Sequence, residues 1–260
     1  MRFIRMSESL LETSMLPPGL QLYTLRSETK DDMLGTLEKV ARIGYRNVEF
    51  FGYGGIPTLV LRKALDHLGL SSVSTYVDLS DLEANLDRHL QDAGVLGIKY
   101  IVTNAPKERF TDDDAFRKMA ASLQYVSDEV RRRGMKLLYH PHEYEFLRRN
   151  GQTDLDRLLN AVGRERMQLA PDLYWIRKGG LDPVGFLQKY RGVVPLTHVK
   201  EMDASGGFTE LGRGITNWPE VFEAMKRAGV RYYFVEQDVS SDPLASVQSS
   251  FNYLRAIGEA

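Results

Sequence analysis

The chain has 260 residues, 43% of them hydrophobic, and its 34 basic and 35 acidic side chains give a formal charge of −1. This composition is ordinary for a globular protein with enough apolar residues for a sizeable core. The balanced charge argues against a general nucleic-acid or membrane-surface role. Because the chain has no cysteine, disulfides and thiolate sites are excluded, and any metal must bind His, Asp, Glu or water.

The N-terminal residues 1–16 alternate apolar residues with Arg5, Glu8 and Glu12, and they lack the uninterrupted apolar stretch of a signal peptide. We expect a loose tail or a short segment that caps the floor of the domain. No stretch is long and apolar enough to suggest a membrane span, so we expect a cytoplasmic protein. Residues 17–260 contain no linker or low-complexity segment, which predicts one domain.

From Pro17 onward, short apolar runs alternate with stretches of helical spacing, most of which end at a glycine. The predicted strands are 20–25, 45–51, 71–77, 98–103, 135–140, one from Met167 to about Asp172, 193–200 and 231–238. The predicted helices are 32–43, 57–68, 81–96, 112–133, 154–162, 184–190, 218–228 and 243–257. Strand starts that recur at roughly 30-residue intervals predict strand–helix units, and eight of them predict an α/β fold, a single (β/α)₈ TIM barrel. A doubly wound sheet is the alternative, but the first strand is not followed by a glycine-rich phosphate loop.

Polar side chains stand near the end of every predicted strand, where parallel α/β proteins bind their ligands. Besides Asp172, His198 and Glu236, they are Gln21, Tyr23, Glu49, Tyr76, Asn104, His140, His142, Lys200 and Asp238. Residues i and i+2 of a strand face the same side, so His140 and His142 could both point into one site. In the alternative, one histidine faces the cavity and the other caps a backbone carbonyl.

Asp172, His198 and Glu236 follow the mostly apolar runs of three successive predicted strands. Together they predict an open site for a hard divalent metal, although each alone could equally form a buried ion pair or hydrogen bond. Lys200 shares the face of His198 and could polarise a substrate oxygen or act as an acid. Its other role would be to neutralise Glu236 or Asp172. Trp175 offers a flat wall for a sugar ring, or simply a core aromatic.

Several motifs of the chain resemble the sugar phosphate isomerase/epimerase family of the xylose-isomerase-like TIM-barrel superfamily. They are Gln21–Arg26 (QLYTLR), Tyr139–Phe146 (YHPHEYEF), Asp172–Trp175 (DLYW), His198–Lys200 (HVK), Phe208–Gly214 (FTELGRG) and Phe234–Asp238 (FVEQD) with Pro243. The resemblance extends from Leu20 almost to the C-terminus. It is specific for the family and much less specific for one reaction.

The resemblance implies four metal ligands, a Glu, an Asp, a His and a Glu at strands five to eight. The last three match Asp172, His198 and Glu236, whereas His140 occupies the place of the first glutamate. In the epimerases of this superfamily the two glutamates form the acid/base pair, so here Glu236 would need His140, His142 or Lys200 as its partner. Further departures are Tyr76 where relatives have His, Pro141 where they have Asn, and Glu201 where they have Asp.

The first functional hypothesis is therefore a metal-dependent isomerase or epimerase of carbohydrate metabolism that acts on a sugar or polyol through an enediolate. Mn²⁺ is the expected ion, with Zn²⁺, Mg²⁺ and Co²⁺ as alternatives. Glu236, His140 and Lys200 are the predicted catalytic residues. The predicted substrate-binding residues are Tyr23, Glu49, Tyr76, Asn104, His142, Glu145 and Trp175.

The missing glutamate favours a second enzymatic hypothesis, a lyase, dehydratase or hydratase that acts on a keto sugar of the 3-keto-glycoside or inosose type. Two further hypotheses are a sugar-binding barrel without catalysis and a DNA-repair enzyme similar to endonuclease IV. The repair enzyme would need many more metal ligands and a basic groove, and the chain has only five histidines. We expect a small-molecule sugar or keto-sugar partner, no nucleic acid, no membrane, and a homodimer as an open alternative to a monomer.

Overall fold

Eight parallel strands form the centre of the computed structural model, which describes residues 15–149 and 151–260. They are β1 (Gly19–Gln21), β2 (Asn47–Phe51), β3 (Ser71–Tyr76), β4 (Tyr100–Thr103), β5 (Lys136–Tyr139), β8 (Met167–Leu169), β9 (Leu196–Val199) and β12 (Tyr232–Val235). Their hydrogen-bonded order is β8-β5-β4-β3-β2-β1-β12-β9. A parallel bridge between Asp172 and His198 joins the two ends of this order. The predicted (β/α)₈ barrel is confirmed.

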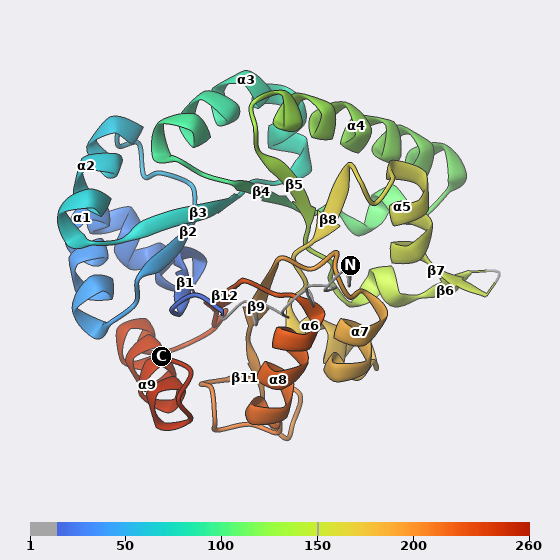
Figure 1. Cartoon of the computed structure of the whole chain (residues 1–260). Coiled ribbons are helices and arrows are strands. Elements are labelled where there is room, and N and C mark those ends of the chain that lie inside the picture. The colour runs from blue at the N-terminus through green and yellow to red at the C-terminus, as the bar shows by residue number, and fades with distance from the viewer. Residues whose placement is uncertain (1–14, 150) are drawn as a thin grey trace, which may run out of the picture.

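The helices lie around the strands, as Figure 1 shows. They are α1 (Arg26–Ile43), α2 (Thr58–Leu68), α3 (Leu79–Leu96), α4 (Asp113–Arg132), α5 (Asp154–Val162), α6 (Leu173–Lys178), α7 (Pro183–Lys189), α8 (Trp218–Ala228) and α9 (Pro243–Ala256). Three 3₁₀ helices, η1 (Leu22–Leu25), η2 (Lys107–Phe110) and η3 (Glu143–Phe146), follow β1, β4 and β5. The bounds predicted for α5 and α8 are those observed, because a cap or glycine marks their ends.

Helix α4 illustrates how the sequence sets these elements. The side chain of Asp112 accepts hydrogen bonds from the backbone N–H groups of Asp114 and Ala115, which begins the helix. Residues at helical spacing, among them Phe116, Leu123 and Val130, are buried against the barrel. The acidic start and the basic end of α4 therefore have structural roles.

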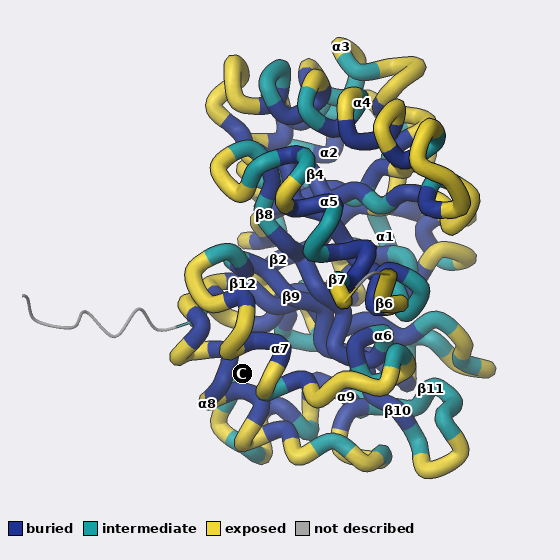
Figure 2. The backbone as a smooth tube through the Cα atoms, turned by 90° about the vertical axis from the view of Figure 1, so that its right-hand side faces the viewer, coloured by how far each residue is buried: buried dark blue, intermediate teal, exposed yellow. Residues whose placement is uncertain are grey.

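The inside of the barrel is filled by apolar side chains below the site. Val73, Val102, Leu138, Leu196 and Phe234 belong to one buried cluster. A Cβ atom on Gly19 would lie 2.4 Å from the ring of Phe234, so only glycine fits there. Buried backbone runs through the middle of the molecule and exposed backbone covers its outside (Figure 2). This packing leaves the C-terminal strand ends as the place for polar groups.

The prediction for the start of the barrel is wrong in two respects. The strand predicted over 20–25 ends at Gln21, because the Gln21 side chain accepts a hydrogen bond from Tyr23 N at 2.9 Å and turns the chain into η1. The helix predicted from Asp32 begins at Arg26. Asp32 is the break inside it, with φ −151° and ψ 87°.

The sixth strand is also shorter than predicted. It ends at Leu169, and Asp172 begins α6 by accepting a hydrogen bond from Tyr174 N at 2.8 Å, so Trp175 lies on a helix. Two short hairpins were not predicted, β6 (Arg148–Arg149) with β7 (Gln152–Thr153), and β10 (Glu201–Met202) with β11 (Phe208–Thr209). Their two-residue strands are too short to give a sequence period.

The predicted tail or capping segment of residues 1–16 lies outside the described residues except for Met15 and Leu16. Leu16 N donates a hydrogen bond to Arg231 O at 3.0 Å, beside the start of β12. Within the described parts of the chain, every helix is too short or too polar to cross a lipid bilayer.

Candidate active site

A cavity of about 280 Å³ opens at the C-terminal ends of the barrel strands. Its lining residues are Gln21, Tyr23, Phe51, Tyr76, Asp78, His140, His142, Trp175, Lys200, Glu236 and Asp238. All three predicted catalytic residues and four of the predicted substrate-binding residues are among them. The barrel thus brings together side chains that lie more than 200 residues apart in the sequence, such as Tyr23 and Glu236.

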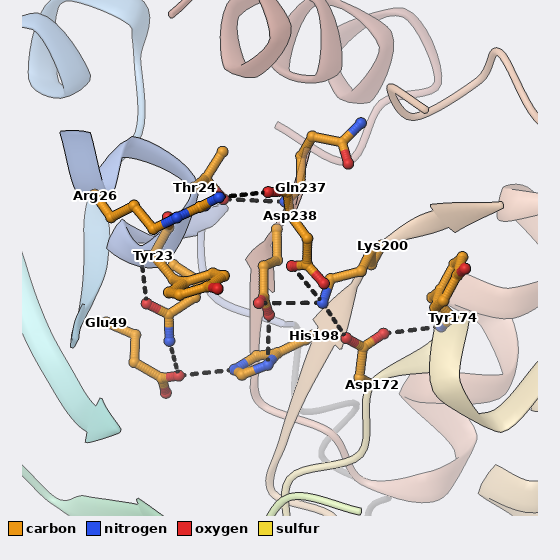
Figure 3. A network of polar contacts seen from close by, with 12 residues as sticks. Tyr23, Thr24, Arg26, Glu49, Asp172, Tyr174, His198, Lys200, Gln237 and Asp238 are labelled. Carbon is orange, nitrogen blue, oxygen red and sulfur yellow. Dashed lines mark hydrogen bonds and ion pairs between the residues drawn. The ribbon is translucent and has the colours of Figure 1, made fainter. Parts of the chain in front are cut away.

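The ammonium group of Lys200 lies among three carboxylates. Its Nζ is 2.7 Å from Asp172 Oδ2, 2.9 Å from Asp238 Oδ1 and 3.1 Å from Glu236 Oε1. Figure 3 shows Lys200 between Asp172 and Asp238. Burial would lower the pKa of Lys200, but the three carboxylates outweigh it and raise that pKa, so the side chain is cationic. This is the neutralising arrangement that the sequence offers as one of two roles for Lys200.

Glu236 and Asp238 respond differently to this ammonium group. Burial opposes ionisation of Glu236, but Lys200 and His198 outweigh it and hold the pKa of Glu236 well below its usual range. At Asp238 burial prevails over Lys200 and raises the pKa to about 6. One wall of the cavity therefore carries two carboxyl groups of different acidity.

His198 is held between two carboxylates. Its Nε2 lies 2.8 Å from Glu49 Oε1, and its Nδ1 lies 2.9 Å from Glu236 Oε2. Burial would lower the pKa of His198, but these carboxylates raise it to about 10. Gln21 Nε2 donates a hydrogen bond to the same oxygen of Glu49. Glu49 is fully buried behind His198 and orients its ring, as a carboxylate beside a metal-binding imidazole does.

Three of the four predicted metal ligands form a group that could hold a cation. His140, Asp172 and His198 each offer one ligand atom, and these atoms lie within 4.8 Å of one another. Buried His140 Nδ1 and Asp172 Oδ2 lack a partner with hydrogen-bond geometry among the described residues. Burial, followed by the charges of His198 and His142, lowers the pKa of His140 well below its usual value, so its imidazole is neutral.

This donor set fits a divalent ion. Two imidazoles and a carboxylate are ligands that Zn²⁺ and Mn²⁺ accept, and all three side chains are buried. Binding would require His198 to lose a proton from one ring nitrogen, and Asp172 Oδ2 to exchange its contact with Lys200 for the metal. Glu236, the fourth predicted ligand, is outside this group but contacts His198.

Aromatic side chains line another part of the cavity. The rings of His142 and Tyr144 are stacked, with centroids 5.6 Å apart, and His142 lies 5.4 Å from Trp175. Burial lowers the pKa of His142 to about 4, so this imidazole is also neutral at neutral pH. Lys200 Nζ lies 5.5 Å from the centroid of Trp175. His142 and Trp175 are therefore in reach of a molecule bound next to Lys200.

Three predicted substrate-binding residues do not line the cavity. Glu49 is behind His198, as described above. Asn104 follows β4 and accepts a hydrogen bond from Leu79 N through its backbone oxygen. Glu145 is fully buried, where it accepts hydrogen bonds from Tyr139 Oη at 2.8 Å and from His142 N at 3.0 Å. Glu145 holds the backbone of His142 and thereby the histidine loop.

The raised pKa of Glu145 should make the free energy of unfolding depend on pH. Burial outweighs its two hydrogen-bond donors and raises its pKa from 4.5 to about 8. The folded state therefore binds the proton more tightly than the unfolded state. Its contribution to stability is complete below pH 4.5 and is lost as the pH rises through 8, with a slope of at most about 1.4 kcal/mol per pH unit.

The measurement is the free energy of unfolding in urea across this pH range. The variant Glu145→Gln has no titrating group at this position, so its stability should fall less than that of the wild type. Glu165→Gln, which removes a carboxylate whose side chain is 70% exposed, should keep the wild-type slope. Identical slopes for wild type and Glu145→Gln would contradict this account.

Four lining residues, Gln21, Phe51, Asp78 and Asp238, were not predicted as catalytic, substrate-binding or metal-binding residues, and only Gln21 and Asp238 among them were noted as polar groups at strand ends. Phe51 ends β2, where its ring lies 4.8 Å from that of Tyr23, and Asp78 follows β3. Both Phe51 and Asp78 lie at the C-terminal strand ends, where other site residues were predicted. Phe51 was not predicted because it belongs to an apolar run, which indicates a core residue. Asp78 was not predicted because a carboxylate before a helix commonly has a structural role.

Comparison with known proteins shows relatives that are enzymes. The chain is 23% identical over 172 residues to an inosose dehydratase from Lacticaseibacillus casei, covering 58% of this chain and only 57% of that protein. It is 23% identical over 267 residues to inosose dehydratase 2 from Bacillus cereus, covering 84% of this chain and 89% of that protein.

Two solved structures share the fold. One is a sugar phosphate isomerase/epimerase from Parabacteroides distasonis, with a TM-score of 0.79 and 22% identity over 94% of this chain and 95% of that one. The other is the IOLI protein with a bound zinc atom, with a TM-score of 0.74 and 14% identity over 93% and 98%. The family model described as xylose isomerase-like TIM barrel matches residues 37–257. The chain therefore belongs to the xylose isomerase-like TIM barrel family.

Proposed function

We propose that this chain is a metal-dependent dehydratase that acts on the ketone of a sugar or polyol. The observation that carries the proposal is the pair of carboxylates at the end of β12. Glu236 and Asp238 are two residues apart, both line the cavity, and both contact Lys200 Nζ. An elimination needs a base and a proton donor within reach of adjacent carbon atoms, and one wall of this cavity offers both.

A bound divalent ion would supply electrostatic stabilisation for the negative charge that develops on the carbonyl oxygen. His140, Asp172 and His198 would hold it. Mn²⁺ is our first choice, and Zn²⁺, Co²⁺ and Mg²⁺ are the alternatives.

The proton movements involve residues of the chain itself. Glu236 accepts the proton from the carbon next to the carbonyl. The electron pair of that C–H bond forms a C=C bond to the next carbon of the ring. At the same time the C–O bond of the hydroxyl on that next carbon breaks. Asp238 donates a proton to the departing hydroxyl, which leaves as water, and Lys200 holds both carboxyl groups in position. His142 and Gln21 donate or accept hydrogen bonds with the remaining hydroxyls, and Trp175 packs against the ring.

Isomerisation or epimerisation is the second candidate, favoured by His140 and His142 on the wall supplied by the β5 end. Their rings lie 5.2 Å apart, and both residues line the cavity together with Glu236. Acid/base groups on two sides of one carbon are what proton removal and return from opposite faces require. Product analysis separates the candidates. A dehydratase converts a keto-polyol to an unsaturated ketone with loss of water, and an epimerase gives an isomer of unchanged mass.

The metal site leads to a specific prediction. After incubation with Mn²⁺ and gel filtration, the wild type should retain about one ion per chain, because a site of three protein ligands is a common catalytic metal site. His198→Ala and Asp172→Ala should lose the ion. His142→Ala is the matched control, because it removes an imidazole next to His140 from outside the ligand group.

Elemental analysis measures the ion content, and circular dichroism checks that each variant is folded. A wild type that retains none of the four candidate ions would contradict the metal site. Retention of the ion by folded His198→Ala and Asp172→Ala would assign it to other residues.

The cytoplasmic location, the homodimer and the absence of a nucleic-acid partner remain predictions from the sequence. A small-molecule sugar or keto-sugar substrate is part of the proposal. The inosose dehydratases among the relatives support it, as does the cavity at the strand ends.

A further inference from the structure

A second cavity, of about 480 Å³, adjoins the candidate active site. The two cavities share Phe51, Tyr76 and Asp78 as a common wall. The second cavity is formed by the loop after β2, the end of β3 and one face of α3. A molecule longer than one ring could therefore extend from the first cavity across Asp78 into the second.

The second cavity combines aromatic faces with hydrogen-bond acceptors. Phe51 is 42% exposed, although it is a large apolar side chain. Tyr53 is fixed in place, because its hydroxyl donates a hydrogen bond to Thr75 Oγ1 at 3.3 Å and its ring packs against Phe50. Asp81 and Asp92 of α3 line the same space. Asp81 accepts a hydrogen bond from Asn85 at 2.7 Å and lies 2.9 Å from His89 Nε2, and Asp92 accepts one from Thr58 at 3.2 Å. Each carboxylate has further lone pairs for the hydroxyl of a ligand. Flat apolar faces next to hydroxyl-binding groups are the arrangement that binds a sugar ring.

The charges of the two cavities disfavour a phosphate group. The second cavity has the carboxylates of Asp78, Asp81 and Asp92, and its one arginine, Arg88, lies 3.9 Å from Asp92. In the first cavity, Lys200 is already surrounded by carboxylates. An anion placed in either cavity would face more negative than positive charge.

We infer that the substrate is an unphosphorylated glycoside with two rings. Its keto ring occupies the first cavity, and an uncharged, hydroxyl-rich second ring lies over Phe51 and Tyr53 with its hydroxyls donating to Asp81 and Asp92. The inference rests on the proposed function, which it narrows from sugar and polyol ketones in general to ketones of two-ring glycosides.

The test compares two substrates that share the reacting ring, methyl glucoside and methyl cellobioside, each oxidised to a ketone at carbon 4 of the non-reducing ring, so that removal of the proton on carbon 3 lets the hydroxyl on carbon 2 leave as water. The protein is the full chain loaded with Mn²⁺. The variant is Asp81→Asn with Asp92→Asn, which keeps the side-chain size and weakens hydrogen bonds to the second ring. Asp87→Asn is the matched control on α3, because the Asp87 side chain is 98% exposed and does not line the cavity.

The wild type should have a KM for the two-ring ketone at least about tenfold below that for the one-ring ketone, since two hydrogen bonds to charged groups contribute this much. The double variant should raise the KM of the two-ring ketone by about tenfold and leave its kcat and the one-ring kinetics unchanged. Asp87→Asn should behave as wild type. A phosphate on the second ring should weaken binding.

Equal kcat/KM for the two ketones in the wild type, or a double variant with unchanged KM, would overturn the inference and leave the proposed function intact. Tighter binding of the phosphorylated compound would also overturn it. If neither ketone reacts, the second subsite is tested on its own by measuring the binding of unoxidised methyl cellobioside to wild type and double variant by calorimetry. Binding that the double variant weakens would support the second subsite while the proposed reaction fails, and no binding would overturn both.

Discussion

Replacing Glu236 with glutamine is expected to lower kcat by about 10³-fold, within the range typical for loss of a general base. The glutamine oxygen and nitrogen can still contact His198 and Lys200, so the cavity should keep its shape. Because the amide cannot accept the proton of a C–H bond, the loss should appear in kcat with little change in KM. Steady-state kinetics of wild type and variant, both loaded with Mn²⁺, measure the effect.

A control carboxylate separates this effect from a general loss of charge. Glu220→Gln, an exposed position on α8, should leave kcat unchanged. If metal-loaded Glu236→Gln retained more than about a tenth of the wild-type kcat, Glu236 would not be the base. His140 or His142 would then be the candidates for that role.

Replacing Lys200 with methionine should cause the largest loss of stability. Methionine has a similar length but leaves buried Asp172 and Glu236, and half-buried Asp238, without their shared cation. Removing one partner from a buried ion pair costs about 3–5 kcal/mol, because the remaining charge has neither water nor a counter-ion. Urea denaturation with a chelator present measures this loss.

A divalent ion should restore part of the stability of Lys200→Met, because it would supply positive charge next to the same carboxylates. Lys226→Met is the matched control. Lys226 also contacts two carboxylates, Glu223 at 3.1 Å and Glu259 at 2.8 Å, but it is 38% exposed. The control should lose at most about 1 kcal/mol. A Lys200→Met variant as stable as the wild type without metal would show that the carboxylates do not depend on this ammonium group.

The sequence predicts the barrel well because each unit carries independent local signals. A glycine past the helix end, an apolar run and helical spacing identify most units, as at α8 with Gly229 and β12. These signals are absent where a side chain redirects the chain. Gln21 ends β1 after three residues, and Asp172 starts α6 directly behind β8. Each of these caps depends on where one side-chain oxygen atom lies. The spacing of apolar residues in the sequence does not predict that position.

The candidate site is predictable to a similar degree. The strand-end rule finds His140, Asp172, His198, Lys200 and Glu236, because all parallel strands end on the same side of a barrel. It offers Glu236 and Asp172 as partners of Lys200, but it does not show that Asp238 also contacts this ammonium group.

The sequence also does not predict which side chains are buried behind the site and hold its residues in position. Glu49 contacts His198, and Glu145 holds the loop of His142. Both were expected to bind substrate because they stand in the right part of the sequence. Their burial depends on neighbouring strands and loops that no short motif describes.

The central claim is that Glu236 removes a proton next to a ketone, and solvent deuterium exchange tests it most directly. A keto-polyol such as an inosose, and a keto-glycoside, would each be incubated in D₂O with the Mn²⁺-loaded wild type and followed by NMR. Dehydration and epimerisation both begin with this proton removal, so the account predicts that deuterium enters the carbon next to the carbonyl in the substrate or product. Glu236→Gln should show only the uncatalysed exchange. A metal-loaded wild type that binds these ketones and leaves every such C–H bond unexchanged would contradict the account.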